Sequence, residues 1–145
     1  MKLVFLLVLV ATLSGVANAG GVDLFNSHCA ICHQGNAAGV PGMYPPLADS
    51  IGNYVRVPAG RAYLVHVVAF GLTGPISVHG QTYVGLMQSW PGLSDEEIAE
   101  VLNYILDTFN SKLIPRDFKP LTADEVKNYR ATTVSIGDLL AQRPR

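Results

Sequence analysis

The chain has no basic run and no face dominated by charge of one sign. Its 10 lysine and arginine residues nearly balance 11 aspartate and glutamate residues, which gives a formal net charge of −1. Proteins that bind nucleic acid through its phosphates need a cluster of positive charge. The composition therefore excludes that class, and we expect no nucleic-acid partner.

The patterns of the common hydrolases and nucleotide-binding enzymes are also missing. The sequence contains no Ser-His-Asp grouping, no pair of carboxylates suited to glycoside chemistry and no glycine-rich phosphate loop. We therefore expect no catalytic residues of these kinds, and the function must come from another feature of the chain.

Long apolar runs are missing beyond residue 19, so the chain after that point holds no expected membrane span. Before it, Lys2 precedes an apolar stretch over residues 3–13, and Ala17 and Ala19 are small residues where a signal peptidase reads them. A retained anchor is the alternative, but the stretch is about half the length that spans a bilayer. The pattern predicts a signal peptide over residues 1–19, cleaved after about Ala19, and a periplasmic protein.

Cysteine is scarce, because Cys29 and Cys32 are the only two in the sequence. Export would allow disulfides to survive, but a bridge across two intervening residues closes a tiny loop and stabilises little. His33 follows the pair directly, giving Cys-Ala-Ile-Cys-His. Two thiols on one helical turn can each add to one vinyl group of a haem, and the adjacent histidine can bind its iron. The motif therefore predicts one covalently attached haem c.

Three other uses of the cysteine pair fit less well. A thioredoxin-like redox pair would need a surrounding βαβ pattern, which is missing. A zinc site would need a second close pair of ligands, whereas His66 and His79 lie in unrelated segments. A plain disulfide fits the helix-and-loop surroundings of the motif less well than haem attachment does.

The predicted secondary structure is helical, and strand patterns are weak throughout. We expect helices over 22–30, 61–70, 94–109 and 122–130, the last two beginning at the capping boxes Ser94-Asp95-Glu96-Glu97 and Thr122-Ala123-Asp124-Glu125. Segments 34–60 and 72–92 are rich in glycine and proline and are predicted to be loops, and 131–145 is a weakly specified tail. Such long ordered loops need something to pack around, and a large flat apolar cofactor would serve.

With these features together, the sequence resembles the class I cytochrome c family over about residues 21–109. Gly21 and Phe25 match the family's Gly-x-x-x-Phe before the haem motif, and Tyr104 matches the aromatic position of its C-terminal helix. In the family these two helices cross, and the glycine allows their close approach. The resemblance implies an all-α domain with long loops wrapped around one haem, over 20–114, followed by a C-terminal extension over 115–145.

Two further segments narrow the resemblance. Residues 39–48, with Gly-Val-Pro-Gly and Pro-Pro-Leu, and residues 80–87 resemble small bacterial cytochromes and the cytochrome subunits or domains of dehydrogenases. Two positions depart from that group. Gln88 stands where many members have proline, so we expect a less rigid methionine loop, and Asp49 stands where glycine is common.

The second ligand of the haem iron, opposite His33, has several candidates in the sequence. They are Met43, Met87, His28, His66 and His79. The resemblance assigns the role to Met87, in a glycine-containing segment before the C-terminal helix. We expect Met43 to be a core methionine, His66 to be a buried helix residue and His79 to face solvent.

The surroundings of the haem follow from the same resemblance. It implies that the Pro45 carbonyl accepts the Nδ1–H of His33 and so fixes the orientation of the ring. Possible partners of the haem propionates or haem edge are Arg56, Arg61, Tyr63, Tyr83 and Trp90.

The function implied by the resemblance is periplasmic electron transfer, with iron cycling between Fe(II) and Fe(III). A His/Met site has no open position and favours reduced iron, which suits an electron carrier rather than an enzyme. The expected partners are redox proteins, such as a dehydrogenase or an oxidase. Two alternatives stay open: a haem-bearing subunit of a dehydrogenase or reductase complex, and a haem protein in which loose methionine ligation lets a small ligand bind.

Overall fold

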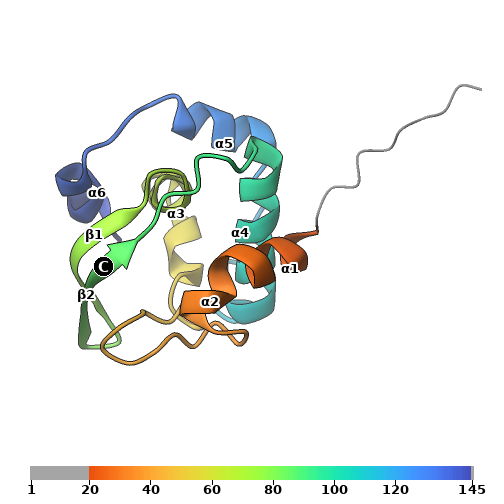
Figure 1. The fold of residues 1–145 in the computed structure, drawn as a ribbon. Coiled ribbons are helices and arrows are strands. Elements are labelled where there is room, and N and C mark those ends of the chain that lie inside the picture. The colour runs from red at the N-terminus through yellow and green to blue at the C-terminus, as the bar shows by residue number, and fades with distance from the viewer. Residues whose placement is uncertain (1–19, 145) are drawn as a thin grey trace, which may run out of the picture.

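The computed structural model describes residues 20–144, so the predicted signal peptide lies outside the described residues (Figure 1). The helices are α1 (Gly21–Leu24), the π-helical turn η1 (Phe25–Cys29), α2 (Ala30–His33), the 3₁₀ helix η2 (Gly52–Arg56), α3 (Pro58–Phe70), α4 (Asp95–Phe109), α5 (Ala123–Arg130) and α6 (Ile136–Gln142). The strands are β1 (Leu72–Val78) and β2 (Gln81–Met87). The mostly helical fold class is confirmed, and no helix in this part of the chain has the length and apolar character needed to cross a membrane.

The N-terminal helical segment, formed by α1, η1 and α2 in succession, packs across α4 (Figure 1). Gly21 makes this crossing possible, because a Cβ atom there would lie 2.5 Å from the Glu100 carbonyl oxygen and 2.7 Å from Tyr104 Cβ. Phe25 is fully buried beside it, with its ring centre 5.6 Å from that of Tyr104 and 5.2 Å from that of Phe109. The crossing implied by the family resemblance is confirmed.

Helix α3 is buried along most of its length and runs between the N-terminal segment and the hairpin (Figure 1). It begins at Pro58, three residues before the predicted start, because proline suits the first turn of a helix, where its missing N–H has no helical partner. It ends at Phe70, as predicted, and Gly71 follows with a φ of 80°.

The prediction of a loop over 72–92 is wrong, because most of this segment forms an antiparallel β-hairpin. Leu72 pairs with Met87 and Val78 with Gln81, and the turn places His79 and Gly80 at φ values of 50° and 78°. Positive φ at both turn residues matches the twist of a two-residue hairpin. Proline is tolerated because both strands of a two-stranded sheet are edge strands. The sequence signal was weak because glycine interrupts both strands and proline also interrupts β1.

Residues 115–144, the described part of the predicted C-terminal extension, pack against the preceding part of the chain. Helix α5 packs against α3 and α4, and α6 packs against α3 and β1 beside the hairpin (Figure 1). The predicted helix to Arg130 is confirmed, but the tail after it is not featureless, because Ser135 caps α6 and Leu139 is buried. Glu125 also departs from the predicted capping box, because its carboxylate binds Arg61 instead of the backbone at Thr122.

Candidate cofactor site

A cavity of about 600 Å³ opens between α2, the 43–51 loop, α3 and the hairpin. Its walls are mostly apolar side chains from these elements and from α4, such as Leu64, Val68, Leu72 and Leu102. Both cysteines, His33 and Met87 line the same cavity, although Met87 lies 54 residues beyond His33. Its size and apolar character fit a large flat cofactor.

The cysteines stand at the end of η1 and inside α2, and both are free, partly exposed thiols. Burial, followed by the charge of the neighbouring Cys32 thiolate, raises the pKa of Cys29 to about 11. The thiol of Cys29 is therefore protonated at neutral pH, unlike the low-pKa thiols of disulfide oxidoreductases. Within residues 20–144 no three His, Cys, Asp or Glu side chains converge as a metal site, so this part of the chain offers no zinc ligand set.

His33 is buried at the end of α2, and its ring is held by the loop that follows. Nδ1 lies 2.9 Å from the Pro45 carbonyl oxygen, which can only accept, so Nδ1 carries the proton and donates a hydrogen bond to that oxygen. That tautomer leaves the Nε2 lone pair available to a metal ion. Burial lowers the pKa of His33, opposed by the hydrogen bond to Pro45, so the ring is neutral at physiological pH, as a metal ligand must be.

The loop geometry that brings Pro45 to His33 depends on Gly39. Its N–H donates to the His33 carbonyl at 2.9 Å, and its φ is 66°, a conformation that favours glycine. A Cβ atom at Gly39 would collide with the Tyr44 carbonyl. The missing side chain of Gly39 thus lets the backbone of Tyr44 and Pro45 pack against it, within reach of His33.

Met87 is the last residue of β2 and lines the cavity from the hairpin. Pairing with Leu72 fixes its backbone, and Gly71 lies so close that a Cβ atom there would be 2.6 Å from the Met87 carbonyl oxygen. The loop predicted around this methionine is therefore wrong, because Met87 belongs to a paired strand. Gln88 also lines the cavity directly after it.

The other candidates for the second axial ligand have separate places. Met43 was expected in the core, but its side chain is 57% exposed at the cavity rim. His66 is buried, as predicted, and its Nε2 donates to the Tyr129 carbonyl at 2.9 Å. His79 is exposed, as predicted, and its Nε2 lies 3.0 Å from the Asp49 carbonyl oxygen. His28 lines the cavity and packs edge-on against Trp90.

Asp49, where the related cytochromes commonly have glycine, keeps the glycine-like backbone. Its φ is 51°, and its N–H donates to the Phe109 carbonyl at 3.0 Å. Aspartate tolerates this conformation better than most residues. The turn after Pro45-Pro46 therefore forms with aspartate at this position.

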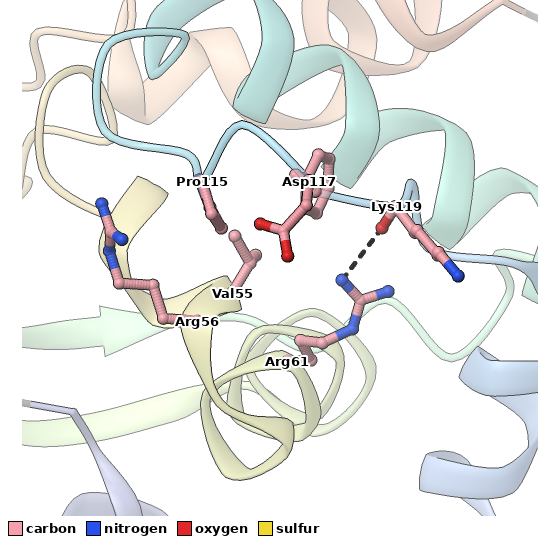
Figure 2. A pocket seen from close by; sticks show the side chains of 7 residues that line it. Val55, Arg56, Arg61, Pro115, Asp117 and Lys119 are labelled. Atoms are coloured by element: carbon pink, nitrogen blue, oxygen red, sulfur yellow. Dashed lines mark hydrogen bonds between the residues drawn. The ribbon is translucent and has the colours of Figure 1, made fainter.

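Arg56 and Arg61 lie away from the large cavity, which corrects their proposed role at the haem. They line a separate pocket of about 260 Å³ beside Pro115 and Asp117 (Figure 2). Arg56 donates to the Leu113 carbonyl, and Arg61 donates to the Lys119 carbonyl at 3.0 Å. Arg61 therefore fastens the C-terminal extension, and Arg56 holds the segment just before it. The other three candidates line the large cavity: Tyr63, Tyr83 and Trp90.

Two residues of the site were not predicted from the sequence. Arg143 follows α6 and lines the large cavity, although nothing in the tail sequence marked it. Asn110 is fully buried behind the 47–52 segment of the cavity wall, to which its side chain is hydrogen bonded. Asparagine is common directly after the last residue of a helix, and this was the only feature of the sequence that pointed to Asn110.

Comparisons with known proteins agree with this arrangement. The family model described as Cytochrome c matches residues 19–109. The chain is 42% identical over 130 residues to a Thermus thermophilus protein named cytochrome c-552, covering 90% of this chain and 87% of that protein. It is also 36% identical over 96 residues to the cytochrome c subunit of a quinone alcohol dehydrogenase from Gluconacetobacter polyoxogenes, covering 66% of this chain and 20% of that subunit.

Proposed function

The chain belongs to the cytochrome c family of covalent haem proteins that carry electrons, and from this we propose that it is a periplasmic carrier with a His33/Met87-ligated haem. The observation that carries the proposal is one apolar cavity lined by Cys29, Cys32, His33 and Met87. In the bound state the haem supplies a one-electron couple between Fe(II) and Fe(III). The residues of this chain decide how the haem is held and which oxidation state is favoured.

The two thiols would attach the haem covalently, and His33 would be one ligand of its iron. Cys29 and Cys32 stand one helical turn apart, as two thioether bonds to neighbouring vinyl groups require. The Pro45 carbonyl fixes the Nδ1–H tautomer of His33 and the plane of its ring, so that Nε2 would be free to bind the iron. The hydrogen bond also increases the basicity of the ligating nitrogen.

Met87 supplies a neutral thioether from an element separate from α2. A thioether favours the reduced, less charged iron and raises the reduction potential. Because β2 is paired with β1 up to Met87, the hairpin would fix the backbone of this ligand. The apolar walls also disfavour the more highly charged oxidised state.

A second candidate function is that of a haem-bearing subunit in a dehydrogenase complex. It is favoured by the similarity to the cytochrome c subunit of a quinone alcohol dehydrogenase. Against it stands the C-terminal extension, which we treat as distinct from a cytochrome domain over 20–114. The extension packs on α3, α4 and β1 of its own chain, so it is not a free arm for docking. We therefore favour a diffusible carrier that meets an electron donor and an acceptor.

The test is to express the full chain in a periplasm that contains haem-maturation machinery and to record oxidised and reduced visible spectra. We expect haem that resists acid extraction, a sharp reduced α-band and a weak far-red band from the sulfur–iron bond. Met87→Ala should abolish the far-red band, whereas the exposed Met43→Ala should leave it intact. Mass spectrometry of the periplasmic protein should find Gly20 at the N-terminus.

Each other result has a distinct meaning. A chain without covalent haem, beside a control cytochrome that matures normally, would refute the proposed function. Covalent haem without a far-red band would refute ligation by Met87, and carbon monoxide binding to the reduced protein would then support the ligand-binding alternative. Co-purification with a large oxidoreductase through salt washes would support the subunit alternative.

A further inference from the structure

Arg143 is the only side chain with a permanent charge in the wall of the large cavity, among the residues that the structure describes. The wall contains no aspartate, glutamate or lysine, and its other polar side chains carry hydroxyls, an amide, an indole N–H, imidazoles and thiols. A cation placed against apolar walls loses hydration and is stabilised when an anion meets it there. The arrangement therefore calls for a negative group in the cavity close to Arg143.

Two tyrosines frame the guanidinium of Arg143. Its central carbon lies 5.8 Å from the ring centre of Tyr54, within the range of a cation–π contact. Tyr63 meets the Tyr54 ring edge-on, with ring centres 5.8 Å apart, and both tyrosines line the cavity. Burial raises the pKa of Tyr63 to about 12 and also raises the pKa of Tyr54, although Arg143 acts in the opposite direction on both. Both phenols therefore stay protonated at neutral pH and can donate hydrogen bonds to an anion beside Arg143.

The packing of α6, which directly precedes Arg143, helps to set the position of that residue. Leu139 of α6 is buried in the core, and Leu140 lies so close to Gly74 of β1 that a Cβ atom there would be 2.9 Å from Leu140 Cδ1. Helix α6 is thereby docked on the hairpin that carries Met87. One residue after this helix, the chain brings Arg143 to the cavity.

We propose that Arg143 pairs with a carboxylate of the haem, and that the docking of the C-terminal extension thereby sets the reduction potential. The inference rests on the proposed function, because haem c carries two propionate groups and no other part of the described cavity wall supplies a permanent positive charge for them. The planar fork of arginine matches a carboxylate with two parallel hydrogen bonds. Arg56 and Arg61 are unavailable, because they line the separate pocket of Figure 2, where Arg56 donates to the Leu113 carbonyl and Arg61 to the Lys119 carbonyl.

The pairing has a direct effect on the iron. A propionate without a partner is a negative charge that stabilises Fe(III), and a nearby arginine cancels that effect. Arg143 therefore favours the reduced state. By linkage, reduction strengthens the docking of the extension as much as docking favours reduction. The extension should be released more readily in the oxidised protein than in the reduced protein.

The experiment compares the haem-loaded full chain with Arg143→Gln, Arg143→Lys and Arg116→Gln by spectroelectrochemical titration. Arg116 is an exposed arginine of the connector, so its variant makes the same change in net charge away from the cavity. We expect a lower midpoint potential for Arg143→Gln, a largely restored potential for Arg143→Lys and no shift for Arg116→Gln. Equal potentials for Arg143→Gln and Arg116→Gln would overturn the pairing.

The linkage is tested by limited proteolysis of the segment between α5 and α6. In the unmodified protein, cleavage should be slower in the reduced state than in the oxidised state, and Arg143→Gln should remove most of that difference. An undiminished difference in Arg143→Gln would overturn the coupling. The visible spectra of every variant keep the two proposals apart, because intact α- and far-red bands with no shift in potential would refute the role of Arg143 alone.

Discussion

Arg61 and Glu125 meet edge to edge across the contact between α3 and the C-terminal extension. Arg61 Nε lies 2.6 Å from Glu125 Oε1, and Nη2 lies 2.6 Å from Oε2. The two side chains are only 15% and 24% exposed, and the Tyr129 hydroxyl also donates to Glu125 Oε1. This two-point geometry is the strongest form of an arginine–carboxylate pair. It fastens the extension to a helix that lines the large cavity.

Substitution of Glu125 should weaken the protein at neutral pH. Glu125→Gln keeps the shape but removes the charge and one acceptor oxygen, so we expect a loss of about 1.5–3 kcal/mol in the free energy of unfolding. Chemical denaturation followed by circular dichroism measures it. Asp107→Asn is the matched control, because that carboxylate is exposed at the surface of α4 and should change stability by less than about 0.5 kcal/mol.

The contribution of Glu125 should also depend on pH. The hydrogen bond from Arg61 holds the pKa of Glu125 below its usual value, with burial acting in the opposite direction. A carboxylate with a depressed folded pKa stabilises the protein above its unfolded pKa of about 4.3, and this stabilisation is lost as pH falls through the folded pKa. The stability difference between the unmodified protein and Glu125→Gln should therefore be complete at about pH 7 and shrink below about pH 4. A difference of constant size down to about pH 3 would assign it to packing instead.

The features that the sequence predicted well are local. The capping box of α4 forms in both directions, with the Ser94 N–H donating to Glu97 at 2.8 Å and the Glu97 N–H donating to Ser94 at 3.2 Å. Cys29, Cys32 and His33 lie within five positions, so their shared helical segment could be inferred directly. In contrast, Glu125 had the same local pattern as Glu97, but a partner 64 residues away claimed its carboxylate.

The features that the sequence did not predict depend on distant contacts. The hairpin forms because Leu72 and its neighbours pair with Met87 and its neighbours, and neither strand has a strong pattern of its own. The place of Met87 could be inferred only from family resemblance. Arg143 enters the cavity because α6 docks on β1, which no local motif encodes. The approach of Pro45 to His33 was likewise inferred from the family resemblance and not from a local motif.

The helix crossing at Gly21 should not tolerate a larger residue. The atoms that a Cβ would meet are the Glu100 carbonyl and Tyr104 Cβ, and both belong to α4, so neither can move without shifting the helix. We expect Gly21→Ala to lower the free energy of unfolding by about 1–3 kcal/mol, as overpacking does. Thermal denaturation of the haem-loaded protein would measure the loss.

The control for that substitution is Gly92→Ala, because a Cβ atom at Gly92 would meet nothing within 4 Å. It should leave stability nearly unchanged. Equal stability of Gly21→Ala and Gly92→Ala would show that the two helices have room to separate, contrary to the close crossing.

Asn110 should be among the residues most important for the cavity wall. Its Oδ1 accepts the N–H groups of Ser50, Ile51 and Gly52 at 3.1–3.2 Å. Its Nδ2 donates to the carbonyls of Leu47 and Ile105 at 3.0 and 3.1 Å. The side chain is 0% exposed, so water cannot replace these bonds without local opening.

Asn110→Ala would leave three N–H groups and two carbonyls without this partner, and unsatisfied buried groups each cost about 1–3 kcal/mol. We expect a loss of at least about 3 kcal/mol in the free energy of unfolding, measured by chemical denaturation. Asn110→Asp should also destabilise, because it keeps the acceptor for the loop but turns an oxygen toward the two carbonyls. Asn53→Ala, which removes an exposed asparagine bonded to the Arg56 side chain, should cost less than about 0.5 kcal/mol. If Asn110→Ala cost no more than Asn53→Ala, the 47–52 segment would be held by its apolar contacts alone, and Asn110 would have no part in shaping the cavity.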